Sequence, residues 1–239
     1  MIEQNLNAFA DAYENDNIYA LDNRLMLNWY PQRILKKSSG ESLLELGLGH
    51  GYTTQLLSKH FPRHVVIDGS AEIIQRFRHL YPDNPSEIVE CYFENFTTDI
   101  RFDVVCMGFV LEHVADPNLI LKRFRRFLKP RGKLFVSVPN ATALNKQLGY
   151  EAGMLADMMA LSEADLAFGH QRLFTRKSLE RLVQDCGYKV ISTEGIFLKP
   201  IATHQIKQLN MSEAILQAML TVGIDYPELC VGLLLEAEA

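Results

Sequence analysis

The chain has no apolar run of about 18 residues, so its sequence predicts no transmembrane helix. The opening segment, MIEQNLNAFADAYEND, has neither the basic nor the apolar region of a secretory signal. Four cysteines are scattered along the chain without a CxxC pair or a histidine at ligand spacing, which argues against a zinc site or a disulfide framework. These absences favour a reduced, cytoplasmic protein that does not bind membranes.

The composition is that of an ordinary globular protein. Of 239 residues, 48% are hydrophobic and 22% are charged, which excludes extensive disorder and low-complexity classes. This length fits one hydrophobic core, so we expect a single domain over residues 1–239. The net charge of −5 argues against a general nucleic-acid binder, and the basic cluster in 122–133 is interpreted as a solvated helix face.

Hydrophobic patterning predicts strands that alternate with helices. Expected strands are 42–47, 64–70, 86–92, 101–108, 132–140, 188–199 and 228–237, and expected helices are 2–36, with a kink or restart at Pro31, 52–60, 71–80, 116–128 and 178–187. Such alternation implies a parallel sheet with helices on both faces. It breaks at 141–170 and 200–226, where we expect two helical insertions that cap the substrate end.

A glycine-rich turn follows the first predicted strand. Glu45-Leu46-Gly47-Leu48-Gly49-His50-Gly51 has a GxGxG spacing, shorter than the GxGxxG dinucleotide fingerprint, and its carboxylate suits a cation better than a pyrophosphate. Asp68 ends the next strand, 17 residues after Gly51, where a carboxylate can accept hydrogen bonds from ribose hydroxyls. The alternative for Asp68 is a structural cap on the following helix.

These motifs together resemble the class I S-adenosylmethionine-dependent methyltransferases, in particular the members that methylate small molecules. The resemblance rests on LLELGLGHG, VVIDGS, FDVVCMGFVLEHVADP, LKPRGKLFVSVPN and HQRLFTRKSLERLVQDCGY, and it covers nearly the whole chain. It implies an α/β, Rossmann-like three-layer sandwich whose seven-stranded sheet is mostly parallel, with the last strand antiparallel. Leu48 departs from the cysteine that many members have there, at a tolerant position.

The resemblance also implies which residues bind S-adenosylmethionine. They are Glu45, Gly47, Gly49, Gly51, Asp68, Gly69, Phe93, Glu94, Met107 and Gly108. Tyr19 and Arg24, on an N-terminal helical lid over 1–36, could pair with the cofactor carboxylate. Instead of binding the cofactor, Phe93 could be a core residue, and Glu94 and Arg24 could be solvated surface residues.

Methyl transfer needs an in-line approach, and a base only where the acceptor carries a proton that must leave. The candidate bases are His170, which closes the first insertion, and His113, which also suits a structural role after the fourth strand. A loop-pinning hydrogen bond is the alternative for His170. Metal-using quinone O-methyltransferases have an acidic residue where this chain has Phe109, so we expect no metal.

Five of the eight methionines lie in the two insertions, namely Met154, Met158, Met159, Met211 and Met219. Methionine adapts to irregular apolar surfaces, so these residues could cover an apolar acceptor. Packing on the core, or a homodimer contact, would use the same side chains.

The sequence thus predicts a methyltransferase that acts on oxygen or nitrogen of a small molecule by in-line displacement. Three alternatives stay open at this point. They are a cofactor-binding regulatory protein without catalysis, an NAD-type oxidoreductase, which the short GxGxG disfavours, and an aminopropyl transferase, which would need an acidic pair after the fourth strand.

Overall fold

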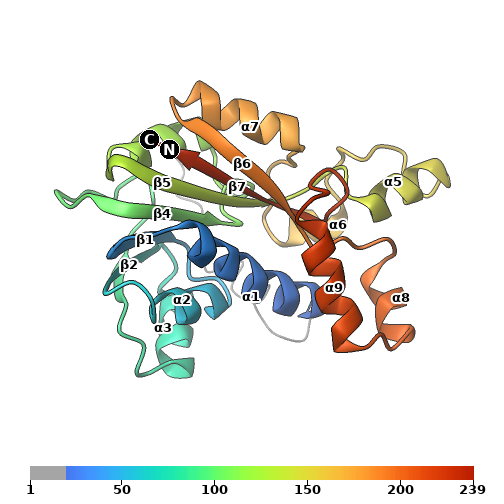
Figure 1. Ribbon diagram of the computed structural model, residues 1–239, viewed down its shortest axis with the longest axis horizontal. Helices are drawn as coiled ribbons and strands as arrows, with labels where there is room; N and C mark the ends of the chain where they lie inside the picture. Colours follow the sequence, from blue (N-terminus) through green and yellow to red (C-terminus); the bar gives the residue numbers. More distant parts are fainter. Residues whose placement is uncertain (1–19) are drawn as a thin grey trace.

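A seven-stranded sheet in the order β3-β2-β1-β4-β5-β7-β6 forms the centre of the protein (Figure 1). This structure is a computed structural model, and it describes residues 20–239. The strands are β1 (Ser42–Leu46), β2 (Arg63–Asp68), β3 (Glu87–Glu90), β4 (Phe102–Gly108), β5 (Leu128–Pro139), β6 (Lys189–Ile196) and β7 (Gly232–Glu238). β7 runs antiparallel to both β5 and β6, and the pairs from β3 to β5 are parallel. The predicted sheet is therefore confirmed.

Helices cover both faces of this sheet and one of its ends. They are α1 (Ala20–Lys37), α2 (Tyr52–Leu57), α3 (Ala71–Leu80), α4 (Pro117–Arg125), α5 (Leu144–Glu151), α6 (Glu163–Ala167), α7 (Arg176–Asp185), α8 (Thr203–Gln208) and α9 (Glu213–Gly223). The helices α1, α2, α3 and α9 pack on one face, and α4 and α7 pack on the other. In Figure 1, α5, α6, α8 and α9 gather at one end of the molecule.

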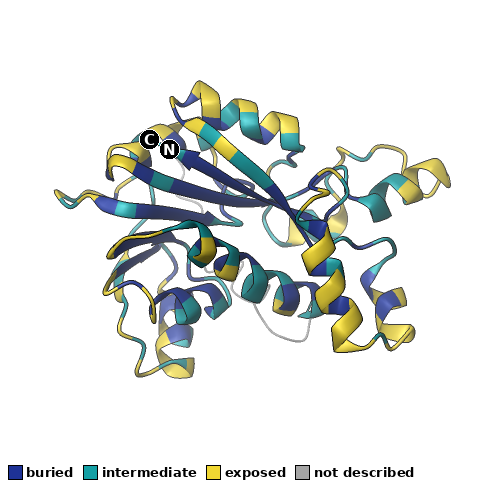
Figure 2. Ribbon diagram, in the orientation of Figure 1, coloured by how far each residue is buried: buried dark blue, intermediate teal, exposed yellow. Residues whose placement is uncertain are grey.

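Burial on both faces explains the apolar strands. All five residues of β1 are buried, because Leu43 faces the α1 side while Leu44 and Leu46 face the α4 side. Figure 2 shows the central strands dark along their length and the outer helix faces exposed. Among residues 20–239, no helix combines the length and apolar character needed to cross a membrane. All four cysteines are free thiols.

The helix α1 continues through Pro31, so the restart that the sequence allowed at this residue does not occur. A proline has no N–H for the carbonyl four residues back, here that of Leu27. The Thr53 hydroxyl, at the start of α2, lies 3.5 Å from this carbonyl oxygen. The Thr53 hydroxyl also lies 2.8 Å from that of Tyr30, so α1 is fastened to the turn that opens α2. Residues 1–19 of the expected lid, with Tyr19, lie outside the described residues.

The helix expected over 116–128 is shorter in the structure, because its last residues join the sheet. Asp116 caps α4 by accepting hydrogen bonds from two backbone N–H groups, and the helix ends at Arg125. Leu128 pairs with Phe102 on β4, so β5 begins four residues earlier than the expected strand over 132–140. Pro130 and Gly132 therefore lie within β5 rather than closing the helix.

Candidate active site

A cavity of about 390 Å³ opens at the carboxyl ends of the strands. Its walls come from the glycine turn after β1, from α1, from the segment after β4 and from the insertion over 141–170. In a parallel sheet, ligands bind at this edge, at the point where the strand order reverses. Here that point lies between β1 and β4, which are neighbours although β2 follows β1 in the chain.

The glycine turn at the cavity floor needs glycine for its conformation and for space. Gly47, Gly49 and Gly51 have positive φ angles of 82°, 50° and 80°. A Cβ on Gly51 would lie 2.7 Å from the Phe77 ring, so a side chain there would displace α3. All three glycines line the cavity, as the sequence predicted for a turn that approaches a ligand closely.

Asp68 connects the end of β2 to this glycine turn. Its Oδ2 accepts a hydrogen bond from the Leu48 N–H at 2.8 Å, and its Oδ1 accepts one from the Ser70 N–H, also at 2.8 Å. Burial raises the pKa of Asp68, although these two backbone hydrogen bonds act in the opposite direction. The N-cap of α3 is Ser70, whose hydroxyl accepts from Ile73 N–H. Asp68 lines the cavity, and each oxygen keeps a lone pair for a ligand.

Glu45 also lies in the cavity wall and is almost fully buried. Its Oε2 is 2.9 Å from Nε2 of His64, a buried histidine on β2. The other ring nitrogen of His64 lies 2.9 Å from the Ser86 hydroxyl. His64 was not predicted from the sequence, because its contact with Glu45 depends on the pairing of β1 with β2.

Of the predicted adenine-side and strand-end residues, Gly69, Phe93 and Gly108 line the cavity, and Met107 and Glu94 do not. Met107 is fully buried in the core on the α4 side, because its side chain points away from the cavity. Glu94 is partly exposed and stands outside the cavity wall.

Gly108, at the end of β4, borders the cavity beneath the Tyr30 ring. A Cβ on Gly108 would overlap the Tyr30 hydroxyl, so glycine is required by this packing and not by a positive φ. Tyr30 also meets Phe109 edge-on, with ring centroids 5.7 Å apart. Tyr30 is a cavity residue that the sequence analysis missed, since its role depends on where α1 crosses β4.

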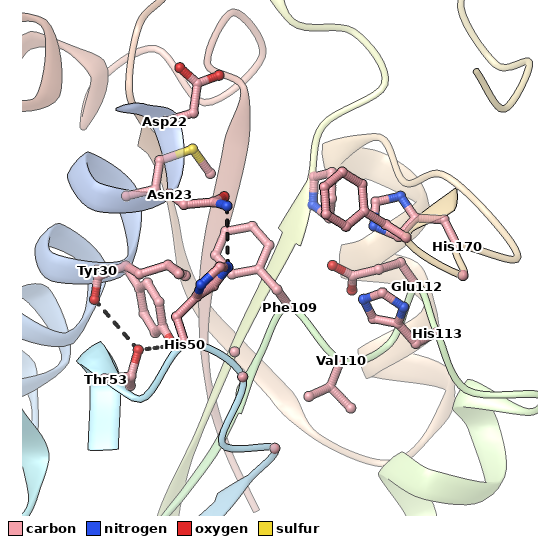
Figure 3. A pocket seen from close by; sticks show the side chains of 18 of the residues that line it. Asp22, Asn23, Tyr30, His50, Thr53, Phe109, Val110, Glu112, His113 and His170 are labelled. Atoms are coloured by element: carbon pink, nitrogen blue, oxygen red, sulfur yellow. Dashed lines mark hydrogen bonds between the residues drawn. The ribbon is translucent and has the colours of Figure 1, made fainter. Parts of the chain in front are cut away.

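The helix α1 touches the cavity through residues other than Arg24. Asn23 Nδ2 lies 3.2 Å from Nε2 of His50 on the glycine turn (Figure 3). Arg24 is half exposed and forms an ion pair at 3.3 Å with Glu213 on α9. Arg24 is therefore absent from the wall of the described cavity, because it lies on the outer face of α1.

Glu112, His113 and His170 lie close together across the cavity from α1 (Figure 3). The segment after α6 holds the loop after β4 in place. Gln171 donates its backbone N–H to the Glu112 carbonyl at 2.8 Å, and its side chain donates to the His113 carbonyl at 2.6 Å. Arg172 donates to the carbonyls of Leu111, Val114 and Ala115. The fold thus brings together both predicted catalytic histidines.

The two histidines differ in their electrostatic surroundings. Burial, followed by the proximity of His170, lowers the pKa of His113 to about 4, and a hydrogen bond to the Gly169 backbone opposes this shift. His113 is therefore neutral at pH 7 and a weak base, which is compatible with the structural role considered for it. His170 Nδ1 lies 3.0 Å from Oδ1 of Asp165, and its ring meets that of His113 edge-on at 4.8 Å.

Glu112 is a buried carboxyl beside these histidines. It is 1% exposed, and neither oxygen has a hydrogen-bond partner among the residues that the structure describes. Burial raises the pKa of Glu112 to about 8, so this side chain carries a proton at pH 7. One ligand atom from each of Glu112, His113 and His170 lies within 4.8 Å of the others, an arrangement that could hold a metal ion. The expectation of no metal rested on Phe109 alone, and this cluster with His170 was not predicted from the sequence.

The first insertion reaches the cavity through polar and small residues rather than its methionines. Asn145, Lys146, Ser162 and Asp165 line the wall together with Phe168 and His170. Met154 is 81% exposed and Met159 is 47% exposed. From the second insertion, Met211 and Met219 pack against the core on the α1 side, and the described cavity has no lining residue from 200–226.

Comparison with known proteins places these features in a family. Residues 19–193 match the family model described as a methyltransferase domain. Ubiquinone biosynthesis O-methyltransferase of Coxiella burnetii is 32% identical over 123 residues, which are 50% of this chain and 52% of that protein. The protein of the same name from Idiomarina loihiensis is 24% identical over 193 residues, covering 79% of this chain and 76% of its own. The chain thus spans about half the length of the first relative.

Solved structures support the same fold. A Thermotoga maritima S-adenosylmethionine-dependent methyltransferase, described as a possible histamine N-methyltransferase, superposes with a TM-score of 0.66 at 16% identity, covering 98% of this chain and 99% of that one. The N-methyltransferase NodS of Bradyrhizobium japonicum, solved with S-adenosylhomocysteine, has a TM-score of 0.56 at 14% identity, covering 94% and 89%. The family match covers well over half of the sequence and the sheet order agrees, so this chain belongs to the class I S-adenosylmethionine-dependent methyltransferase family.

Proposed function

We propose that this protein transfers a methyl group from S-adenosylmethionine to a hydroxyl of a small molecule. One observation carries the proposal. A single cavity is lined at one side by the glycine turn with Asp68 and at the other by Glu112, His113 and His170. The first side suits the cofactor and the second suits the acceptor. The O-methyltransferase names of the curated relatives favour oxygen over nitrogen as the methylated atom.

The residues at the cofactor side fit S-adenosylmethionine. All three glycines, Gly47, Gly49 and Gly51, line the cavity, so the backbone of this turn borders the space for a ligand. The remaining lone pairs of Asp68 would accept the ribose hydroxyls. Phe93 would cover the adenine, and Glu45 would accept a donor from the methionine end, since both line the cavity. When bound, S-adenosylmethionine supplies an electrophilic methyl group on its sulfonium.

The residues at the acceptor side would position the nucleophile and take its proton. Phe109, Val110 and Phe168 provide an apolar wall for the acceptor. His170 would accept the hydroxyl proton as the oxygen attacks, because His113 is too weak a base at pH 7. Positioning in line with the methyl would contribute the larger part of the rate.

The proposal assigns the proton to His170 and not to a metal-bound oxygen. Asp165 already engages Nδ1 of His170, and Glu112 carries a proton at pH 7. A divalent cation would have to displace that proton to use the Glu112 carboxylate. We therefore expect turnover to survive treatment with EDTA, and a loss that added Mg²⁺ or Zn²⁺ restores would assign the cluster to a metal.

The experiment measures S-adenosylhomocysteine release from labelled S-adenosylmethionine with panels of small phenols and small amines. We expect the phenols to receive the methyl group. With the best acceptor, His170→Asn should lower kcat by about 10²–10⁴-fold while the Kd for S-adenosylhomocysteine stays near wild type. His113→Asn serves as the matched control and should chiefly lower the melting temperature. Methylation confined to the amines would overturn the assignment to oxygen, and tight cofactor binding without any turnover would favour a regulatory protein.

A further inference from the structure

Asp165 is a cavity-lining carboxylate with a defined hydrogen-bond arrangement on both of its oxygens. Its Oδ2 accepts hydrogen bonds from the Ser162 N–H at 2.8 Å and from the Ser162 hydroxyl at 2.6 Å. The first of these bonds, together with the bond from the Asp165 N–H to the Ser162 hydroxyl at 3.1 Å, forms the capping box of α6. Oδ1 of Asp165 lies 3.0 Å from Nδ1 of His170. The two oxygens therefore have different partners and are not interchangeable.

The ionisation state of Asp165 decides which atom donates in the contact with His170. Both the Ser162 N–H and the Ser162 hydroxyl donate to Oδ2, an arrangement typical of a carboxylate. A carboxylate can only accept hydrogen bonds. It follows that Nδ1 of His170 carries the hydrogen, and Nε2 carries the lone pair of the neutral ring.

The backbone reinforces this geometry. The His170 N–H donates to the Asp165 carbonyl oxygen at 2.9 Å, which closes the turn after α6. The side chains of His170 and Asp165 are 13% and 16% exposed, so the contact is shielded from water. A carboxylate in such a contact fixes both the orientation and the tautomer of an imidazole.

We propose that Asp165 is the positioning residue of this active site, because it holds His170 in the tautomer whose Nε2 can accept a proton from the methyl acceptor. The inference rests on the proposed role of His170. On proton transfer, the O–H bond of the acceptor breaks, the Nε2–H bond forms, and the imidazolium is stabilised by the Asp165 carboxylate beside Nδ1. The capping box is thereby part of the catalytic arrangement as well as the start of a helix.

Asp165→Asn gives a distinctive result if this proposal is right. The Ser162 N–H requires an oxygen at the Oδ2 position, so the amide NH₂ of the asparagine must take the Oδ1 position. That NH₂ would donate to Nδ1 of His170, which forces the hydrogen onto Nε2. The variant should therefore invert the tautomer and not merely weaken the contact.

The test is ¹⁵N NMR of the histidine rings in full-length protein saturated with S-adenosylhomocysteine, at pH 8. The resonances of His170 are assigned by their loss in His170→Asn. We expect the Nδ1–H tautomer in wild type, the Nε2–H tautomer in Asp165→Asn and a mixture of both in Asp165→Ala. Ser162→Ala is the matched control, because it damages the same capping box but leaves the Oδ1 contact, and it should keep the wild-type tautomer.

An unchanged tautomer in both Asp165 variants would overturn the proposal, and so would an equal change in Ser162→Ala, which would indicate a structural effect of α6. This readout needs no acceptor, so it is separable from the proposed function. If the tautomer inverts while His170→Asn keeps full turnover, the positioning by Asp165 stands and the base role of His170 fails.

Discussion

The Tyr30 hydroxyl occupies the space that a Cβ on Gly108 would need. This contact sets the distance between α1 and the end of β4, and both residues line the cavity. Tyr30 is held there by the Thr53 hydroxyl at 2.8 Å, at the start of the helix that follows the glycine turn. The helix α1, the glycine turn and the strand β4 are thus joined through one tyrosine.

Gly108→Ala should destabilise the protein by about 1–3 kcal/mol, the usual cost of forcing extra atoms into a packed core. The same substitution in a Tyr30→Phe background should cost less, because the oxygen 2.1 Å from the added Cβ is gone, while the ring carbon Cζ at 2.8 Å remains. Urea unfolding of the four proteins in this cycle measures the difference. Equal costs in both backgrounds would show that the Tyr30 hydroxyl does not restrict position 108.

Asp68→Ala should weaken binding of S-adenosylhomocysteine by at least about 1.5–3 kcal/mol, the contribution of one charged hydrogen-bonding group. Part of this loss comes from the freed Leu48 N–H and is independent of the ribose. The analogue without the ribose 2′-hydroxyl separates the two effects in calorimetry. Wild type should discriminate against the analogue and the variant should not, whereas undiminished discrimination would remove Asp68 from the ribose.

Arg24→Ala should leave cofactor affinity within about twofold. Arg24 is engaged by Glu213 on the outer surface, and an exposed ion pair of this kind contributes about 0–1 kcal/mol. Calorimetric titration with S-adenosylhomocysteine is the measurement, with Glu213→Ala as the control that removes the other partner. A tenfold loss of affinity in Arg24→Ala alone would restore this residue to the cofactor site.

Glu112→Gln should gain stability relative to the wild-type protein as the pH rises. Burial raises the folded-state pKa of Glu112 from 4.5 to about 8. The stability that the protonated carboxyl provides is complete below pH 4.5 and is lost as pH rises through about 8. The neutral amide avoids this loss, so the melting-temperature difference should grow between pH 5 and pH 8 and then level off. A difference that stays constant over this range would show that the carboxyl does not titrate in this way.

The sequence predicted a helix or strand correctly where residues close together in the chain determine its ends. The helix predicted over 71–80 has the same bounds as α3, because Ser70 caps it and its apolar residues have helical spacing. The predicted end of the helix over 116–128 was wrong, because Leu128 pairs with Phe102 on the neighbouring strand. This contact joins residues that are distant in the sequence.

In the candidate site, too, residues with a local sequence signature were predicted, and residues whose roles depend on distant contacts were not. The glycine turn and Asp68 were predicted, because strand-to-helix turns have a sequence signature. Tyr30 and His64 were missed, because their roles depend on which elements cross in space. Asp165 had a readable signal in the capping box that begins at Ser162, three residues before it, but its contact with His170 depends on the turn after α6.

The central claim is that the cavity binds S-adenosylmethionine through the glycine turn and Asp68. Isothermal titration of the wild-type chain with S-adenosylhomocysteine, with and without excess NAD, tests it most directly. The account predicts one site per chain and an affinity that NAD does not change. Absence of binding, or displacement of S-adenosylhomocysteine by NAD, would contradict it.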